Sequence, residues 1–181
     1  MAVPARSQWV IGDEKLIDEN RHVRLSTVDV TLPDGTEFTQ YVVRMPQCAM
    51  TLVLDDDERV LLMYRHRFVI DRWVWELPGG FIDGAEDIAA AAAREVEEET
   101  GWRPRTMEHL ATFQPAIGTL DQPQHVYLAR GADPTGEPPD INETERVEWV
   151  PLVDAVAMID RGEIVGGACV VAIYRALTLD S

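Results

Sequence analysis

Apolar and polar residues alternate in the first quarter of the chain. Between residues 21 and 32 the apolar side chains recur at every second or third position, and a second such segment follows at 38–45. A period of two is typical of half-buried β-strands. The Pro-Asp-Gly sequence at 33–35 favours a turn. The pattern therefore predicts a β-hairpin near the N-terminus.

The rest of the chain mixes short strands with helices. Apolar segments bounded by turn residues predict strands at 49–54, 59–64, 73–77, 106–114, 125–129 and 146–150. The acidic run 55–58 and the Pro- and Gly-containing stretch 131–139 are predicted to be a turn and a loop. Helical spacing predicts helices at 87–100, 152–160 and 168–177.

The first of these helices has the clearest signals. It contains five consecutive alanines, which are strong helix formers, and Gly101 and Pro104 are residues that end helices. Strands mixed with three helices imply a layered α/β (α+β) domain. We expect this domain to cover residues 47–181 and the N-terminal hairpin to form a β appendage at residues 1–46.

Composition limits the function. The chain has 181 residues, 46% of them hydrophobic, which suffices for a packed core. Its formal net charge of −16 argues against a nucleic-acid partner and against binding to an anionic membrane. Cys48 and Cys169 lie in apolar runs and are expected to be small buried hydrophobes. Without a signal peptide or a long apolar stretch, we expect a cytoplasmic protein.

Three glutamates are placed for metal binding. Glu95, Glu98 and Glu99 are spaced three and four residues apart, so they share one face of the predicted helix, whereas Glu97 points elsewhere. Arg94 can pair with Glu98. Crowded carboxylates suit hard cations such as Mg²⁺ or Mn²⁺. The alternative is a solvated helix with a surface ion pair of little energetic value.

The wider frame favours the metal site. Gly80 is followed by Glu86 and then by residues 94–102, R-E-V-E-E-E-T-G-W. This spacing resembles the Nudix box, G-x5-E-x7-R-E-U-x-E-E-x-G-U, where U is bulky and apolar. Trp102 stands where the family usually has an aliphatic residue. The resemblance implies a Nudix-type α/β/α sandwich with a mixed sheet and an enzyme that splits a diphosphate linkage with water.

The resemblance also implies roles for the box residues. The metal ligands would be Gly79 through its carbonyl, Glu95, Glu98 and Glu99. Glu86 and Arg94 match residues that orient the cluster, and the cofactor would be Mg²⁺ or Mn²⁺. A divalent cation would also explain how so acidic a protein accepts an anionic substrate.

Segments outside the box resemble the ADP-ribose pyrophosphatase branch of the family. Residues 75–80, W-E-L-P-G-G, resemble its W-E-L-P-A-G segment, and 64–67 resemble its R-Q-Y-R strand. Pro115 and Gly118 match part of a P-S-P-G-like segment, in which Ile117 replaces the second proline. The branch uses an N-terminal β appendage to form a domain-swapped dimer. The resemblance thus implies a homodimer that converts a nucleoside diphosphate sugar, ADP-ribose first, into AMP and ribose 5-phosphate.

Further candidate residues lie outside the box. Arg44 and Arg67 are candidates for contacts to phosphate or terminal ribose, with surface arginines as the alternative. In the loop before the last predicted strand, Glu143 is the preferred general base and Glu145 a metal contact, because the box carboxylates would be occupied by metal. If neither acts, Glu98 is the next candidate base. An adenine-stacking aromatic has no clear match, although His22 and Phe38 lie near the expected place.

Two other functions stay open. One is a Nudix hydrolase for another nucleotide sugar or a nucleoside triphosphate, and the appendage and Pro115 favour a sugar diphosphate over a triphosphate. The other is a nucleotide-sensing module that has kept the fold and lost catalysis, which would be expected to have a damaged box.

Overall fold

The computed structural model describes residues 8–139 and 144–179. The chain forms two compact units. Unit 1 consists of Met1–Pro46 and Ala116–Gln122, and unit 2 consists of Gln47–Pro115 and Pro123–Ser181. The chain passes from unit 1 to unit 2 after Pro46, and residues 116–122 return to unit 1.

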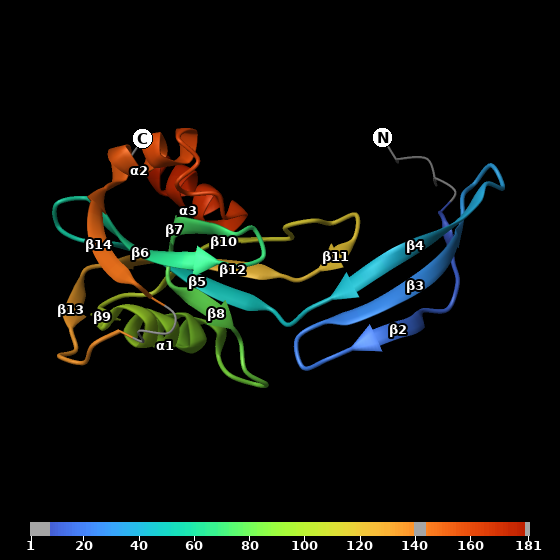
Figure 1. The fold of residues 1–181 in the computed structure, drawn as a ribbon, viewed down its shortest axis with the longest axis horizontal. Coiled ribbons are helices and arrows are strands. Elements are labelled where there is room, and N and C mark those ends of the chain that lie inside the picture. The colour runs from blue at the N-terminus through green and yellow to red at the C-terminus, as the bar shows by residue number, and fades with distance from the viewer. Residues whose placement is uncertain (1–7, 140–143, 180–181) are drawn as a thin grey trace, which may run out of the picture. The chain divides into compact units, whose positions relative to one another are not determined.

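Unit 1 is a five-stranded sheet (Figure 1). Strands β3 (Arg24–Thr31) and β4 (Glu37–Arg44) pair antiparallel along their whole length, which confirms the predicted hairpin. Three short strands join them: β1 (Val10–Ile11), β2 (Lys15–Glu19) and β11 (Leu120–Asp121). The prediction of a simple hairpin was incomplete, because β1 and β2 are exposed strands without an alternating pattern and β11 comes from far along the chain.

Unit 2 is built on a seven-stranded sheet with the order β10-β12-β5-β6-β14, in which β7 pairs with β6 and β8 with β5. The strand bounds are Cys48–Leu54 (β5), Arg59–Arg67 (β6), Arg72–Glu76 (β7), Gly79–Phe81 (β8), Glu108–Phe113 (β10), Gln124–Arg130 (β12) and Arg146–Pro151 (β14). Strand β12 runs parallel to β5 and the other pairs are antiparallel, so the sheet is mixed, as predicted.

One predicted loop is wrong in part. Residues Ala132–Pro134 form strand β13, which pairs antiparallel with β9 (Trp102–Pro104). Both strands are three residues long and contain proline, so they lack a readable period. Their pairing is set by tertiary contact and not by local pattern.

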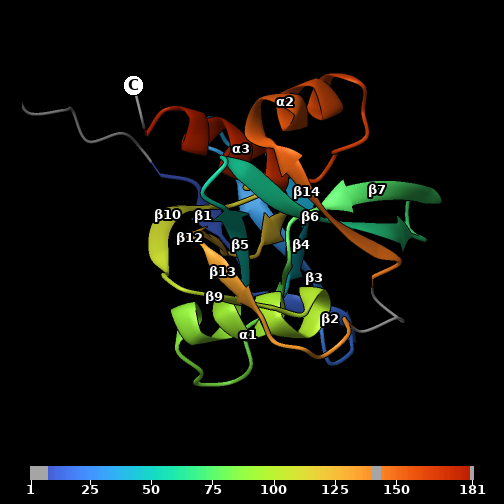
Figure 2. The same cartoon turned by 90° about the vertical axis from the view of Figure 1, so that its left-hand side faces the viewer.

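The three helices agree with prediction to within one residue. They are α1 (Ile88–Thr100), α2 (Leu152–Asp160) and α3 (Gly167–Leu177). Helix α1 lies on one face of the larger sheet, and α2 and α3 lie on the other (Figure 2). Unit 2 is therefore the expected α/β/α sandwich.

The central strands of unit 2 are buried on both faces. Leu52 and Leu62 pack in the cluster that contains residues of α2 and α3, whereas Val53 and Leu61 pack with Val96 of α1. This explains the near-continuous apolar runs of β5 and β6, since a strand covered on both sides needs no polar face. In the described part of the chain, no helix is long and apolar enough to cross a membrane.

Both cysteines are unbridged. Cys169 is buried in the cluster with α3, where desolvation raises the pKa of its thiol to about 12, and Cys48 is half-buried. Cys169 therefore behaves as the predicted small hydrophobe.

Candidate active site

Helix α1 is fixed at both ends. At its start, the Asp87 side chain accepts a hydrogen bond of 3.0 Å from the amide of Ala90, which is a standard N-cap. At its end, Gly101 has a φ of 73°, and a Cβ there would lie 2.6 Å from the carbonyl oxygen of Glu137. Only glycine fits this left-handed, crowded position. The glutamates of α1 are therefore presented from a rigid element.

Strand β8 approaches α1 closely through two glycines. The amide of Gly79 donates a hydrogen bond of 2.7 Å to Oε2 of Glu99. A Cβ on Gly80 would lie 2.6 Å from Oε2 of Glu95. Any side chain at residue 80 would displace that carboxylate. The two glycines thus bring the main chain of β8 and the carboxylates of α1 together.

Glu99 is almost completely buried, with 3% of the residue exposed. Its Oε1 accepts a bond of 2.8 Å from Nη1 of Arg65 on β6, whose side chain is itself only 13% exposed. The sequence analysis did not single out Arg65. Strand alternation could have found it, because Arg65 and the candidate Arg67 lie on the same face of β6.

Arg94 binds three carboxylates at once. Its Nη1 donates to Glu95 and to Glu98 at 2.8 Å each, and its Nε and Nη2 each donate to Glu86 at 3.2 Å. The hydrogen bonds from Arg94 lower the pKa of Glu86, and those to Glu86 most strongly raise the pKa of Arg94. The Arg94–Glu98 pair that the spacing predicted is present. Glu97 points elsewhere and binds Arg103 at 2.9 Å.

The charges of this cluster suit a divalent cation. Glu86, Glu95, Glu98 and Glu99 carry four negative charges and Arg65 and Arg94 two positive ones, which leaves a formal charge of −2. Hard oxygen donors of this kind are the ligands of Mg²⁺ and Mn²⁺. Among the described residues, no three His, Cys, Asp or Glu side chains are already grouped as ligands of one ion. Glu95 and Glu98 would therefore exchange a contact with Arg94 for a contact with metal.

The candidate residues outside the box make other contacts. Arg67 is held by Glu76 through Nε at 2.9 Å, and this pairing raises the pKa of Arg67. The amide of Glu145 donates a bond of 3.0 Å to the carbonyl of Tyr64, and the Glu145 side chain is exposed. Glu143 lies outside the described residues. Pro115 belongs to unit 2.

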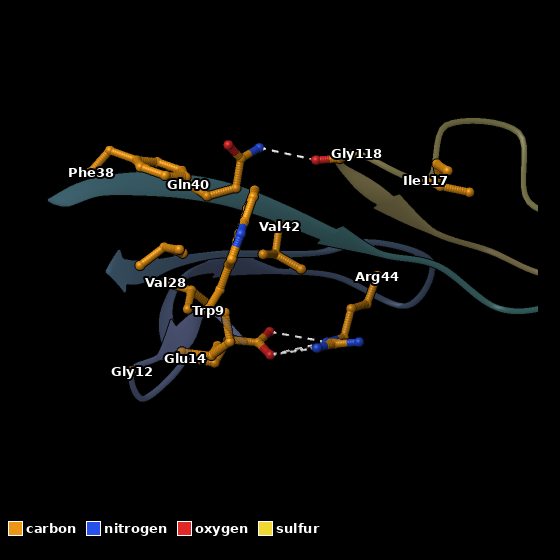
Figure 3. A pocket seen from close by; sticks show the side chains of 12 residues that line it. Trp9, Gly12, Glu14, Val28, Phe38, Gln40, Val42, Arg44, Ile117 and Gly118 are labelled. Carbon is orange, nitrogen blue, oxygen red and sulfur yellow. Dashed lines mark hydrogen bonds and ion pairs between the residues drawn. The ribbon is translucent and has the colours of Figure 1, made fainter. Parts of the chain in front are cut away.

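Unit 1 contains a pocket of about 580 Å³ that includes Arg44, Gly118 and Phe38 (Figure 3). Arg44 pairs there with Glu14 at 2.8 Å, and it also pairs with Asp121 at 2.7 Å. His22, the other aromatic candidate, is not among the lining residues.

The aromatic wall of this pocket was partly missed. The sequence analysis named Phe38 but not Trp9, whose ring meets Phe38 edge-to-face at 6.1 Å. Trp9 comes just before β1 and carries no periodic signal.

The chain is similar in sequence to known proteins. The family model for the NUDIX domain matches residues 45–166. A CMP-5′-(N-acetyl-N-hydroxy-3-aminopropyl)phosphonate hydrolase from Streptomyces rubellomurinus is 43% identical over 95% of this chain and 84% of its own length. An ADP-ribose pyrophosphatase from Mycobacterium tuberculosis is 33% identical over 82% of this chain and 75% of its own length.

A solved structure shares the fold. It is described as the crystal structure of an ADP compounds hydrolase, and it superposes with a TM-score of 0.83 over 97% of this chain and 95% of that one. Sequence identity between the two is 16%, so this likeness concerns the fold alone.

Proposed function

The chain belongs to the Nudix hydrolase family, and we propose that it hydrolyses the diphosphate bond of a nucleoside diphosphate sugar, with ADP-ribose as the first candidate. One observation carries the proposal. The α1 face combines an intact box, a buried Glu99 and a formal charge of −2, and a diphosphate can approach such a face only with a cation between them. This also argues against a silent sensing module, which would not need to keep these carboxylates.

We assign the ion to Glu95, Glu98 and Glu99 together with the carbonyl of Gly79. A divalent ion bound there supplies a neutralising charge for the diphosphate and lowers the pKa of water. Arg65 fixes the direction of the Glu99 carboxylate at 2.8 Å, and Glu86 holds Arg94 beside the other two. These arginines orient the ligands, as groups around metal sites commonly do.

The choice of ADP-ribose is supported by the 33% identical pyrophosphatase and by the W-E-L-P-G-G and Tyr64–Arg67 segments. The products would be AMP and ribose 5-phosphate. Arg67 lies on the same strand face as Arg65 and is our candidate for a contact to the sugar phosphate, for which it would have to share or leave Glu76.

A second candidate substrate is a CMP-linked phosphonate. The observation that favours it is the 43% identity over 95% of the chain with a CMP-phosphonate hydrolase. The bond cleaved in such a compound is an anhydride between two phosphorus atoms. Its negatively charged oxygens would also need a cation between them and the α1 face. The two candidates differ in the base and in the group beyond the second phosphorus.

A substrate panel tests the proposal. The full chain with Mg²⁺ is given ADP-ribose, a CMP-phosphonate and a nucleoside triphosphate such as 8-oxo-dGTP, and released phosphomonoesters are separated by ion-exchange chromatography. We expect ADP-ribose to have the largest kcat/KM. A larger value for the CMP-phosphonate would replace ADP-ribose by the second candidate. A larger value for the triphosphate, or binding without turnover of any compound, would contradict the proposal.

A further inference from the structure

A second group of charged and aromatic side chains lies on the opposite side of the larger sheet from the carboxylates. It lines a cavity of about 410 Å³ between β6, β7, β14 and the turn after α2. We call it the arginine–tryptophan pocket and define it by Tyr64, Arg72, Trp73, Arg146, Arg161 and Glu163. Its volume is within the range of roughly 300–1,000 Å³ that small-molecule sites occupy.

Strand alternation separates this pocket from the α1 face. Arg65 of β6 binds Glu99, so its neighbour Tyr64 points to the other face of the sheet. Tyr64 accordingly packs against the cluster that includes residues of α2 and α3, as does Trp75. The pocket is therefore distinct from the candidate active site and does not depend on its proposed function.

One wall of the pocket is aromatic. The β6–β7 register places Tyr64 opposite Trp75 and His66 opposite Trp73. Tyr64 and Trp73 are stacked with a ring-centroid distance of 5.3 Å and an interplanar angle of 23°. Trp73 remains 48% exposed. An indole that is half-exposed and held by a stacked neighbour offers a preformed face for a planar group.

The other walls are cationic. Arg72, Arg146 and Arg161 come from three separate elements, and Glu163 is the single acid among the lining residues, so the formal charge is +2. In a chain with a net charge of −16, this is a local reversal of sign. Guanidinium groups bind phosphate through paired hydrogen bonds. The same arginines would repel a cationic ligand.

Each of the three arginines is held by a neighbouring group but keeps N–H donors for a ligand. Arg72 donates through Nη2 to the carbonyl of Gly162 at 2.6 Å. Arg161 uses Nε and Nη2 for Glu163. The guanidinium carbon of Arg146 lies 4.8 Å from the Tyr64 ring centroid, which is a cation–π distance. Because a guanidinium has five N–H donors, these contacts position the groups without using up their hydrogen bonds.

Two effects oppose an anion. Glu148 forms an ion pair with Arg146 at 3.3 Å and offsets part of its charge. The pocket includes Arg161 and Gly162 at the C-terminal end of α2, where the helix dipole is negative. This end carries only about half an elementary charge, and the carbonyl of Gly162 already accepts from Arg72. With Glu163 and Glu148 both counted, the three arginines still leave a formal charge of +1, which decides the sign.

We propose that the arginine–tryptophan pocket binds a nucleoside monophosphate, whose base stacks on Trp73 and whose phosphate is bound by Arg72, Arg146 and Arg161. The aromatic wall requires a planar ring and the arginines require an anion. A nucleotide combines the two in one small molecule. A simple phosphate or sugar phosphate would leave the exposed surface of Trp73 uncovered.

The test is calorimetric titration of the full chain with AMP and with CMP in excess EDTA, where the diphosphatase cannot turn over. Adenosine and ribose 5-phosphate are titrated as half-ligands. We expect saturable binding of a nucleotide, with both half-ligands at least about tenfold weaker, since stacking alone is worth roughly that factor or more.

Variants locate the site. Trp73→Leu and Arg72→Gln, both at exposed residues, should each weaken nucleotide binding about tenfold or more. Trp73→Phe should retain most of the wild-type affinity because it keeps an aromatic ring. Arg103→Gln, a matched loss of an exposed arginine, and Glu99→Gln on the α1 face should leave binding unchanged.

Three results would overturn the proposal. The first is no binding of either nucleotide at millimolar concentration. The second is ribose 5-phosphate binding as tightly as AMP. The third is loss of binding in Glu99→Gln, or in Trp9→Leu of the unit 1 pocket, while Trp73→Leu still binds, because this would place the nucleotide elsewhere.

Discussion

Individual side chains set the electrostatics of the α1 face. Arg94 contacts Glu86, Glu95 and Glu98, and its charge holds these carboxylates close together without cancelling their total. A guanidinium remains charged at any ordinary pH, so Arg94 stays paired with the three carboxylates, whose negative charges outnumber its own positive charge. A divalent ion at Glu95 and Glu98 competes with Arg94 for the same oxygens. The affinity for the ion therefore depends on the free energy needed to move the Glu95 and Glu98 carboxylates away from Arg94.

Glu99→Gln is expected to lower kcat about a hundredfold or more, because it removes the charge of a principal ligand. The amide can still accept from Gly79, but the hydrogen bond from Arg65 no longer goes to a charged carboxylate, so we expect a loss of stability of about 1–3 kcal/mol without unfolding. Steady-state kinetics and thermal melting measure the two effects. Glu97→Gln, which faces Arg103, is the matched control. In a mutant that keeps more than about a tenth of the wild-type kcat, the activation barrier has risen by less than about 1.4 kcal/mol, and Glu99 is then not a principal ligand.

Gly80→Ala is expected to weaken cation binding. Its Cβ would lie 2.6 Å from Oε2 of Glu95 and must push that carboxylate aside. We expect the Mn²⁺ affinity, measured by electron paramagnetic resonance, to fall about tenfold, as it does when groups that orient metal ligands are disturbed. Gly167→Ala is the control, because a Cβ there meets nothing within 4 Å. Equal Mn²⁺ affinities of the two variants would show that Gly80 does not shape the ion site.

Sequence spacing predicts part of this site and misses part of it. Glu95, Glu98 and Glu99 follow from helical periodicity, and the pairing of Arg94 with Glu98 follows from the same geometry. Arg65 does not follow from local spacing, because it lies 34 residues before Glu99 and meets it only when β6 packs over α1. Trp9 is missed for a similar reason, since it faces Phe38 only after β1 has joined the sheet.

At the scale of elements, prediction follows the strength of the local signal. Helix α1 begins and ends as predicted because Asp87 caps it and Gly101 ends it. The buried strands β5 and β6 were also predicted, but β6 continues three residues beyond its predicted end at residue 64. Strands β9 and β13 pair with each other across 28 or more residues and are too short for a period, so only tertiary packing defines them.

The loop that leads into β14 is expected to carry the base. The alternation of β14 predicts that Glu145 lies on the face opposite Arg146, which is the α1 face. Glu143→Gln and Glu145→Gln are made separately, and kcat is measured at saturating Mg²⁺ and substrate. Loss of the base should lower kcat about a hundredfold with little change in KM. Wild-type rates in both variants would exclude this loop and leave Glu98 as the next candidate.

At the scale of the whole molecule, unit 1 leaves apolar side chains in solvent. Trp9, Ile11 and Ile117 line its pocket and are 56%, 60% and 86% exposed. A small sheet with one apolar face needs a covering surface to be stable. We therefore expect a homodimer with unit 1 in its interface.

Light scattering coupled to size exclusion tests the dimer. At micromolar concentration we expect twice the chain mass of 20.3 kDa, and Trp9→Glu should shift the mass toward the monomer. Val153→Glu, at an exposed apolar residue of α2 in unit 2, is the matched control and should remain dimeric. A wild-type mass of one chain would contradict the prediction.

We expect the α1 face to hydrolyse a nucleoside diphosphate compound only when a divalent ion is bound. The most direct measurement is the rate of AMP release from ADP-ribose by the full chain, first in excess EDTA and then after Mg²⁺ is added beyond the chelator. We expect no turnover in EDTA and full recovery of the rate with Mg²⁺. The reason is that four carboxylates and two arginines leave two negative charges facing the diphosphate. Turnover at the same rate in excess EDTA would contradict it.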